Sequence, residues 1–148
     1  MIYKLILMDK KYDYALVEGN LNEIVDFVEH QIENHCALEV AVEPSICLTM
    51  VQAEDSVESQ QFYLGEVLTT DCEVVLDGKT GYGIVSGDQP VRAYCIAVFD
   101  ALFKGDNNLK TRAIEFVEHL HEQVKIQEKK EFNNILRTRV DFKLMEQA

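Results

Sequence analysis

The sequence contains no tryptophan, only two prolines, and no Lys or Arg between Lys11 and Lys79. Residues 1–74 hold 15 acidic and 3 basic side chains, whereas residues 75–148 hold 11 of each. Phosphate backbones and anionic membranes are bound mainly by cationic side chains, so this distribution argues against nucleic acid and membrane surfaces as partners. Two interpretations of the acidic half stay open: a solvated face that favours solubility, and a docking surface for a more basic partner.

Long hydrophobic runs are also missing. The run from Leu5 to Met8 is followed at once by charged residues, and it is too short for a signal sequence or a membrane span. We therefore expect a cytoplasmic protein. A length of 148 residues with 47% apolar content predicts a single domain, 1–148, in which segment 132–148 depends on a partner for its order.

The cysteines form no Cys-x-x-Cys pair, which excludes the usual zinc-ribbon and redox motifs. We expect reduced thiols, as is typical of the cytoplasm. Cys47 and Cys95 have apolar neighbours and are expected to be buried, and alternation along its strand predicts that Cys72 points inward. The fourth cysteine is Cys36.

Alternating and helical periods of apolar residues predict an α+β fold. A first helix is expected around residues 12–17, and a second begins after an N-cap at Asn20. A third helix is expected to begin at an N-cap at Asp88, with Pro90 in its first turn, and to end at Gly105. A fourth helix is expected to begin at residue 109 and to fray near residues 129–131. Strands are expected at 38–43, 46–51, 62–68, 72–76 and 82–85, with a final extended segment from 135 to 145. An Asp77-Gly78 turn joins the last two of those strands. The architecture is an antiparallel meander of about five strands with N-terminal helices and two later helices packed on the sheet.

Common catalytic and phosphate-binding motifs fail. Gly78-Lys79-Thr80 resembles the end of a phosphate loop, but the earlier glycine is replaced by Glu73. Gly81-x-Gly83 lacks the third glycine of a dinucleotide site. The histidines, at positions 30, 35, 119 and 121, have no recognised zinc spacing, so no metal site is expected.

An ordered set of residues nevertheless resembles one family, the G subunit of the bacterial carbon–phosphorus lyase core complex (the PhnG family). The residues that carry the resemblance are Phe62, Gly65, Glu66, Thr70, Val74, Leu76, Gly81, Tyr82, Gly87, Ala93, Ala97, Asp100, Ala101 and Leu102, followed in the tail by Arg139, Val140, Asp141, Phe142 and Met145. No single piece is specific to the family; the order of the whole set is.

The resemblance implies a non-autonomous subunit of a transferase complex in phosphonate catabolism, inactive on its own. In that family the complex transfers an alkylphosphonate to the ribose C1′ of ATP and releases adenine. The implied partners are H-, I- and J-type subunits. ATP and methylphosphonate are then substrates of the complex, this chain binds no cofactor, and the iron–sulfur cluster and S-adenosylmethionine belong to another subunit.

Three polar residues are the site candidates that follow from the resemblance: Glu66, Arg139 and Asp141, expected at an interface rather than in catalysis. Each also has a plain structural interpretation, since Glu66 can cap a turn and the other two can pair along a strand. The chain departs from the family at Asp71 and at Asp88-Gln89-Pro90, where the family carries basic residues. Loss of those cations argues against direct contact with an anionic substrate.

Two other functions stay open. One is a free-standing accessory or ligand-binding module that forms a homodimer or larger homo-oligomer when isolated. The other is an intrinsic enzyme in which Glu66 and Asp100 act as acid and base.

Overall fold

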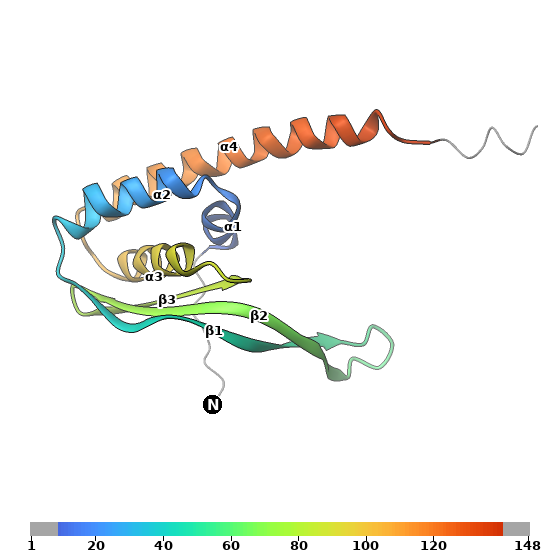
Figure 1. The fold of residues 1–148 in the computed structure, drawn as a ribbon, viewed down its shortest axis with the longest axis horizontal. Helices are drawn as coiled ribbons and strands as arrows, with labels where there is room; N and C mark the ends of the chain where they lie inside the picture. Colours follow the sequence, from blue (N-terminus) through green and yellow to red (C-terminus); the bar gives the residue numbers. More distant parts are fainter. Residues whose placement is uncertain (1–8, 141–148) are drawn as a thin grey trace, which may run out of the picture.

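The computed structural model describes residues 9–140 and shows helices layered on one face of a sheet (Figure 1). Helix α3 (Pro90–Lys104) lies directly on the sheet. Above it lie α1 (Lys10–Glu18), α2 (Leu21–Phe27), a π-helical turn η1 (Val28–Glu33) and the long helix α4 (Lys110–Leu136). The predicted α+β class, with helices packed on an antiparallel meander, is confirmed. No helix in residues 9–140 combines the length and apolar character needed to cross a bilayer.

The sheet has three strands rather than about five. Its order is β1 (Leu38–Glu54), β2 (Gln61–Leu76) and β3 (Lys79–Ser86), and both pairs are antiparallel. The predicted strands 38–43 and 46–51 are one strand, as are 62–68 and 72–76. Pro44 does not end β1 because it lies at a register shift between Val42 and Ser45 in an edge strand, where its missing N–H is tolerated.

Local chemistry sets several element ends as predicted. The Asn20 side chain caps α2 by accepting from the amide of Asn22 at 3.0 Å. Asp77 and Gly78 both have positive φ, as a two-residue hairpin turn requires. Helix α3 starts at Pro90 and ends at Gly105 as expected, although its N-cap position is Gln89 rather than Asp88.

The end of α4 differs from the prediction. The helix does not fray near residues 129–131 but continues to Leu136, so residues 135 and 136 are helical rather than extended. Lys, Glu and Gln dominate this stretch and favour a helix, and neither Gly nor Pro interrupts it. Most of the predicted C-terminal extended segment, residues 141–145, lies outside the described residues.

Helix α3 approaches β3 so closely that no side chain fits between them. A methyl group on Gly81 would overlap the Ala97 carbonyl oxygen, and one on Gly83 would overlap the Ala93 carbonyl oxygen. Both glycines are buried on the face of β3 that carries Val85. The alanines on α3 and the glycines on β3 therefore form the contact that joins helix and sheet.

Aromatic rings join α3 to the outer helices. The Phe27 ring of α2 stacks on Phe116 of α4 at 4.3 Å between ring centres, and on Phe99 of α3 at 5.6 Å. Arg92 of α3 donates to the carbonyl oxygens of Leu16 at 2.6 Å and Gly19 at 3.1 Å, at the C-terminal end of α1. A cation at this end also suits the helix dipole.

The thiols follow the sequence expectation in part. All four cysteines are free; Cys72 and Cys95 are buried, whereas Cys47 is only half-buried because it points to the face of the sheet away from the helices, where its Sγ atom lies 3.3 Å from Thr69 Oγ1. Burial, with Glu33 nearby, raises the pKa of the Cys95 thiol to about 12.

We predict that Gly83→Ala lowers the free energy of unfolding by about 3 kcal/mol, because the added methyl group forces α3 away from β3. Urea unfolding followed by circular dichroism measures the change. Gly105→Ala is the matched control: a Cβ there finds its nearest neighbour at 3.6 Å, and φ is −87°. The control should stay within about 0.5 kcal/mol of the native chain. An equal loss of unfolding free energy in both variants would contradict the close approach of α3 to β3.

We also predict that stability falls with rising pH between about 9 and 12 through Cys95. The unfolded thiol ionises above its ordinary pKa of 9.0, whereas the folded thiol stays protonated to about 12. The folded state then binds more protons, so its stability decreases by about 1 kcal/mol per pH unit from this residue. Urea unfolding at pH 8 and pH 10 should show a shallower decrease for Cys95→Ala. Parallel decreases would rule out this contribution.

Candidate functional site

Part of the family-like residue set forms the junction between β3 and α3. Asp100 is buried, and its Oδ2 atom accepts from the Tyr82 amide at 2.8 Å and from Lys104 Nζ at 2.6 Å. Lys104 also donates to the Thr80 carbonyl oxygen at 3.2 Å, and its ammonium lies 5.0 Å from the centre of the Tyr82 ring. Ala101 lies against Gly81. The Gly-Tyr and Asp-Ala pairs thus join β3 to α3.

A second part of the set ties β2 to the start of α3. The Thr70 hydroxyl donates to the Gly87 carbonyl oxygen at 2.6 Å and accepts from the Gln89 amide at 3.0 Å. Thr70 is 1% exposed, so these bonds satisfy a buried hydroxyl. Thr70 and Gly87 accordingly have a structural role.

Glu66 and Asp100 do not form an acid–base pair. Glu66 is exposed on β2, opposite Met50. Asp100 binds Tyr82, whose partner on β2 is Glu73, about 20 Å along the strand from Glu66. Glu66 also caps no turn, since it lies within the strand.

Arg139 is exposed and follows α4, so it and Glu66 lie on different parts of the fold. Its amide donates to the Leu136 carbonyl oxygen at 3.3 Å. Asp141, the third candidate, lies outside the described residues. The interface role expected for these three residues stays a prediction.

The positions where cations were expected offer no anion site. The Asp71 carboxylate accepts from the Thr69 hydroxyl at 3.0 Å, and that hydroxyl also bonds Thr49 Oγ1 at 2.8 Å. Asp88 is exposed in the loop before α3. The two acidic residues stand on β2 and next to Gly87, where a phosphate or phosphonate would be repelled.

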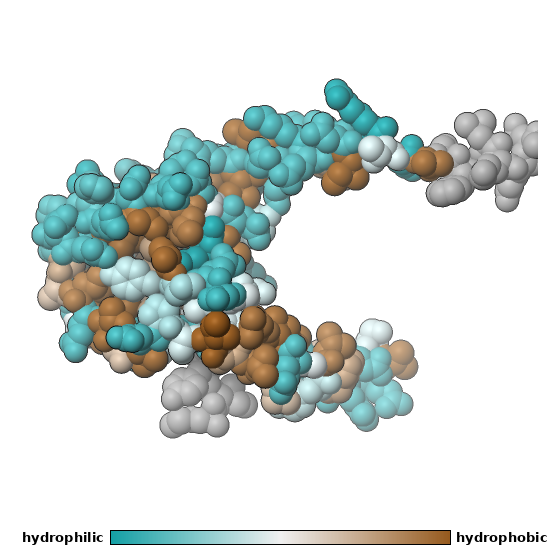
Figure 2. Space-filling model, viewed as in Figure 1, coloured by the Kyte–Doolittle hydropathy of each residue, from teal (hydrophilic) through white to brown (hydrophobic). Residues whose placement is uncertain are grey.

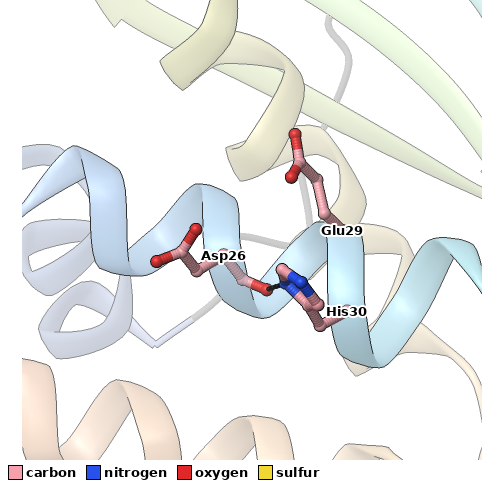
Figure 3. A group of neighbouring side chains, drawn as sticks. All are labelled: Asp26, Glu29 and His30. Carbon is pink, nitrogen blue, oxygen red and sulfur yellow. Dashed lines mark hydrogen bonds between the residues drawn. The ribbon is translucent and has the colours of Figure 1, made fainter.

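Asp26, Glu29 and His30 bring three potential metal ligands within 4.8 Å of one another at the junction of α2 and η1 (Figure 3). All three are exposed. The Nδ1 atom of His30 bonds the Asp26 carbonyl oxygen at 2.9 Å, which leaves only Nε2 for a ligand. Exposed acidic groups of this kind are common on protein surfaces, and the group carries no functional argument.

Two surface hollows are acidic. One, of about 420 Å³, lies between the α1–α2 junction and α4 and is lined by four glutamates and no Lys or Arg. Tyr14 lies in it and donates a hydrogen bond to Glu128, which raises the pKa of the tyrosine to about 12. The other, of about 540 Å³, lies at the tip of the β1–β2 hairpin beside Glu54 and Asp55. Neither hollow suits a triphosphate or a phosphonate.

The most unusual feature is a pair of arms that leave the helix-covered core. The hairpin arm comprises residues 46–68, the outer halves of β1 and β2 with their loop. Beyond Thr69, which pairs with Ser86, β2 pairs only with β1. The helical arm comprises residues 125–136, the part of α4 that follows its last buried residue, Val124. All residues of the helical arm are exposed, as are residues 61–68 of the hairpin arm.

Both arms carry large apolar side chains that the described chain leaves uncovered. On the hairpin arm these are Ile46, Leu48, Met50, Val57, Phe62, Tyr63, Leu64, Val67 and Leu68; on the helical arm they are Ile126, Phe132, Ile135 and Leu136. Figure 2 shows hydrophobic residues gathered along the hairpin arm, where it borders the open side between the two arms. Single exposed apolar residues are ordinary, but so many on two arms are typical of surfaces that bind another molecule.

The register gives the hairpin arm an inner apolar face. Ile46 lies opposite Thr70, and Leu48 lies opposite Leu68. Opposed side chains share a face, and Thr70 points to the side occupied by α3, so Ile46, Leu48 and Leu68 point to the helix side of the sheet. Leu48 is 62% exposed there because α3 does not extend over this half of the sheet.

The described residues 9–140 form an α+β fold with two uncovered apolar arms, a surface typical of proteins that bind other molecules. The comparisons with known proteins identify the family. The family model of the phosphonate metabolism protein PhnG matches residues 11–147, so the chain belongs to the PhnG family. None of the curated proteins compared with the chain matches it.

Sequence reasoning found the family-like residues but missed the arms. It assigned the apolar alternation at 46–51 and 62–68 to covered strands, although half of each strand extends past α3. One sequence feature sets the hairpin arm apart: its 23 residues, 46–68, contain four acidic side chains and no Lys or Arg. The sequence also left the role of Asp100 open, because that role depends on a hydrogen bond from the Tyr82 amide on β3.

We predict that Asp100→Ala destabilises the chain by about 2 kcal/mol, because the Tyr82 amide and the Lys104 ammonium lose their common acceptor. The value is modest because Lys104 can turn to solvent. Asp106→Ala, at an exposed position just after α3, is the control and should change stability by less than about 0.5 kcal/mol. Thermal and urea unfolding measure both. An unchanged Asp100→Ala variant would show that the junction does not depend on this carboxylate.

Proposed function

We propose that the chain is a non-autonomous subunit of a carbon–phosphorus lyase complex in the cytoplasm. There it supports transfer of an alkylphosphonate, methylphosphonate for example, to the ribose C1′ of ATP with release of adenine. The proposal gives the chain no substrate of its own. The observation that carries it is the uncovered apolar surface of the hairpin and helical arms.

Membership of the PhnG family supports the link to phosphonate metabolism. The step from family to complex comes from the resemblance in residues 62–102, which implies H-, I- and J-type partner subunits. The arms give such partners apolar surface to cover, and both acidic hollows are poor sites for ATP or a phosphonate. The chemistry is accordingly assigned to the partners, together with the iron–sulfur cluster and S-adenosylmethionine.

The role proposed for Glu66 follows from its place. It lies on the hairpin arm at a position where the family-like set has a Gly-Glu pair, and it is exposed among apolar side chains. A carboxylate at the rim of an apolar patch suits pairing with a partner's cation, which sets orientation more than affinity. Arg139 suits the complementary pairing with an acidic group beyond the helical arm.

Leu48→Glu tests the proposal. Leu48 is 62% exposed in the isolated chain, so the variant should fold with unchanged stability. When the chain is produced together with the H-, I- and J-type subunits, the variant should bind them about 30-fold more weakly, the loss expected for one buried leucine. Affinity capture followed by native mass measurement gives the association, and adenine release from ATP plus methylphosphonate gives the turnover.

Val91→Glu is the matched control, since Val91 is 49% exposed on α3 and lies on neither arm. It should bind the partners as the native chain does. Failure of the native chain to bind any of these subunits would refute the proposal. A homodimer in its place would favour the accessory module.

A further inference from the structure

The hairpin arm is a long pair of strands with no third strand beside it among the described residues. Strand β1 has 17 residues and β2 has 16, against about 3–10 in most strands. The third strand stops opposite Thr69, so the outer half of the hairpin is a two-stranded ribbon. Such a ribbon is marginally stable in water unless a third strand or a helix adds to it.

One edge of the sheet is already partly occupied. The outward amide of Tyr82 on β3 donates to the Asp100 carboxylate, and the Thr80 carbonyl accepts from Lys104. Side chains of α3 therefore occupy two of the backbone groups that an added strand would need there. The other edge belongs to β1, and within the described residues no strand pairs with it on the side away from β2.

The edge of β1 differs between its two halves. The inner half carries Glu39, Glu43 and Pro44, which are the residue types that protect edge strands from pairing. The outer half, residues 45–53, contains no charge, no proline and no glycine. The inner half of the β1 edge is therefore protected from pairing with another strand, whereas the outer half is open to it.

We propose that residues 45–53 of β1 bind an extended segment of a partner subunit, which adds a fourth strand to the sheet. The segment has an apolar or β-branched centre and Lys or Arg at its ends. Those cations face Glu43 at one end of the open edge and Glu54, Asp55 and Glu58 at the other. This inference rests on the proposed function, because it supposes a heteromeric partner.

A second copy of the chain is a poor occupant of the same edge. In an antiparallel pairing of two copies centred on Thr49, Glu43 of each copy faces Asp55 of the other. Like charges directly opposite destabilise a strand pair, and this arrangement has two such pairs. The absence of any Lys or Arg from residues 12 to 78 leaves no nearby cation to compensate.

Hydrogen–deuterium exchange of the chain, alone and within the co-purified complex, tests the inference. In the isolated chain, the amides of residues 45–53 that point away from β2 should exchange quickly. In the complex their exchange should slow by about 100-fold, as bonded strand amides do. The edge amides of residues 39–43 should be unchanged and serve as the internal control.

The possible results separate the inference from the proposed function. No complex at all would refute both. A complex in which residues 45–53 exchange as in the isolated chain would refute the added strand alone. Protection already present in the isolated chain also refutes it: loss of that protection on removal of residues 1–8 would identify this chain's own segment as the occupant, and a doubled mass would identify a second copy.

Charge reversal tests the proposed cations. Glu43→Lys with Glu54→Lys should weaken association about tenfold at low salt, with a smaller effect at about 0.5 M salt. Glu29→Lys with Glu115→Lys makes the same change in net charge at exposed positions away from β1. Equal weakening by both pairs would show that only net charge matters and would contradict cationic ends on the segment.

Discussion

The close approach of α3 to β3 is the constraint on which the rest of the fold depends. Gly81 and Gly83 let the backbone of α3 lie directly against the strand. Because α3 is held there, Phe99 is placed to stack with α2 and α4, and Arg92 is placed at the end of α1. The outer helices thus depend on two positions that carry no side chain.

The family-like residues fall into two groups, those at the contact between α3 and the sheet and those beyond it. Thr70 bonds the backbone of Gly87 and Gln89, and Asp100 bonds the backbone of Tyr82, where β2 and β3 meet α3. Phe62, Gly65 and Glu66 lie on the exposed hairpin arm, away from the contact between α3 and the sheet. The first group joins the sheet to α3, whereas the second group stays exposed in the described chain.

Features set by a few neighbouring residues could be predicted from the sequence: the Asn20 cap, the Asp77-Gly78 turn and the end of α3 at Gly105. Features set by distant contacts could not. Whether Pro44 ends a strand, for example, depends on which edge of the sheet it occupies. The continuation of α4 through residues 129–131 is a local feature, which the helix propensity of its Lys, Glu and Gln residues could have predicted. The exposure of Leu48 could not be predicted either, since an apolar residue that a partner covers has the same pattern as one in the core.

The uncovered edge at residues 45–53 has a consequence for the life of the chain before assembly. A newly made copy presents an uncharged strand edge and two apolar arms to every other protein in the cell, which are the features that chaperones bind and proteases act on. Burial of that edge and of the two arms would therefore protect the chain from aggregation and proteolysis.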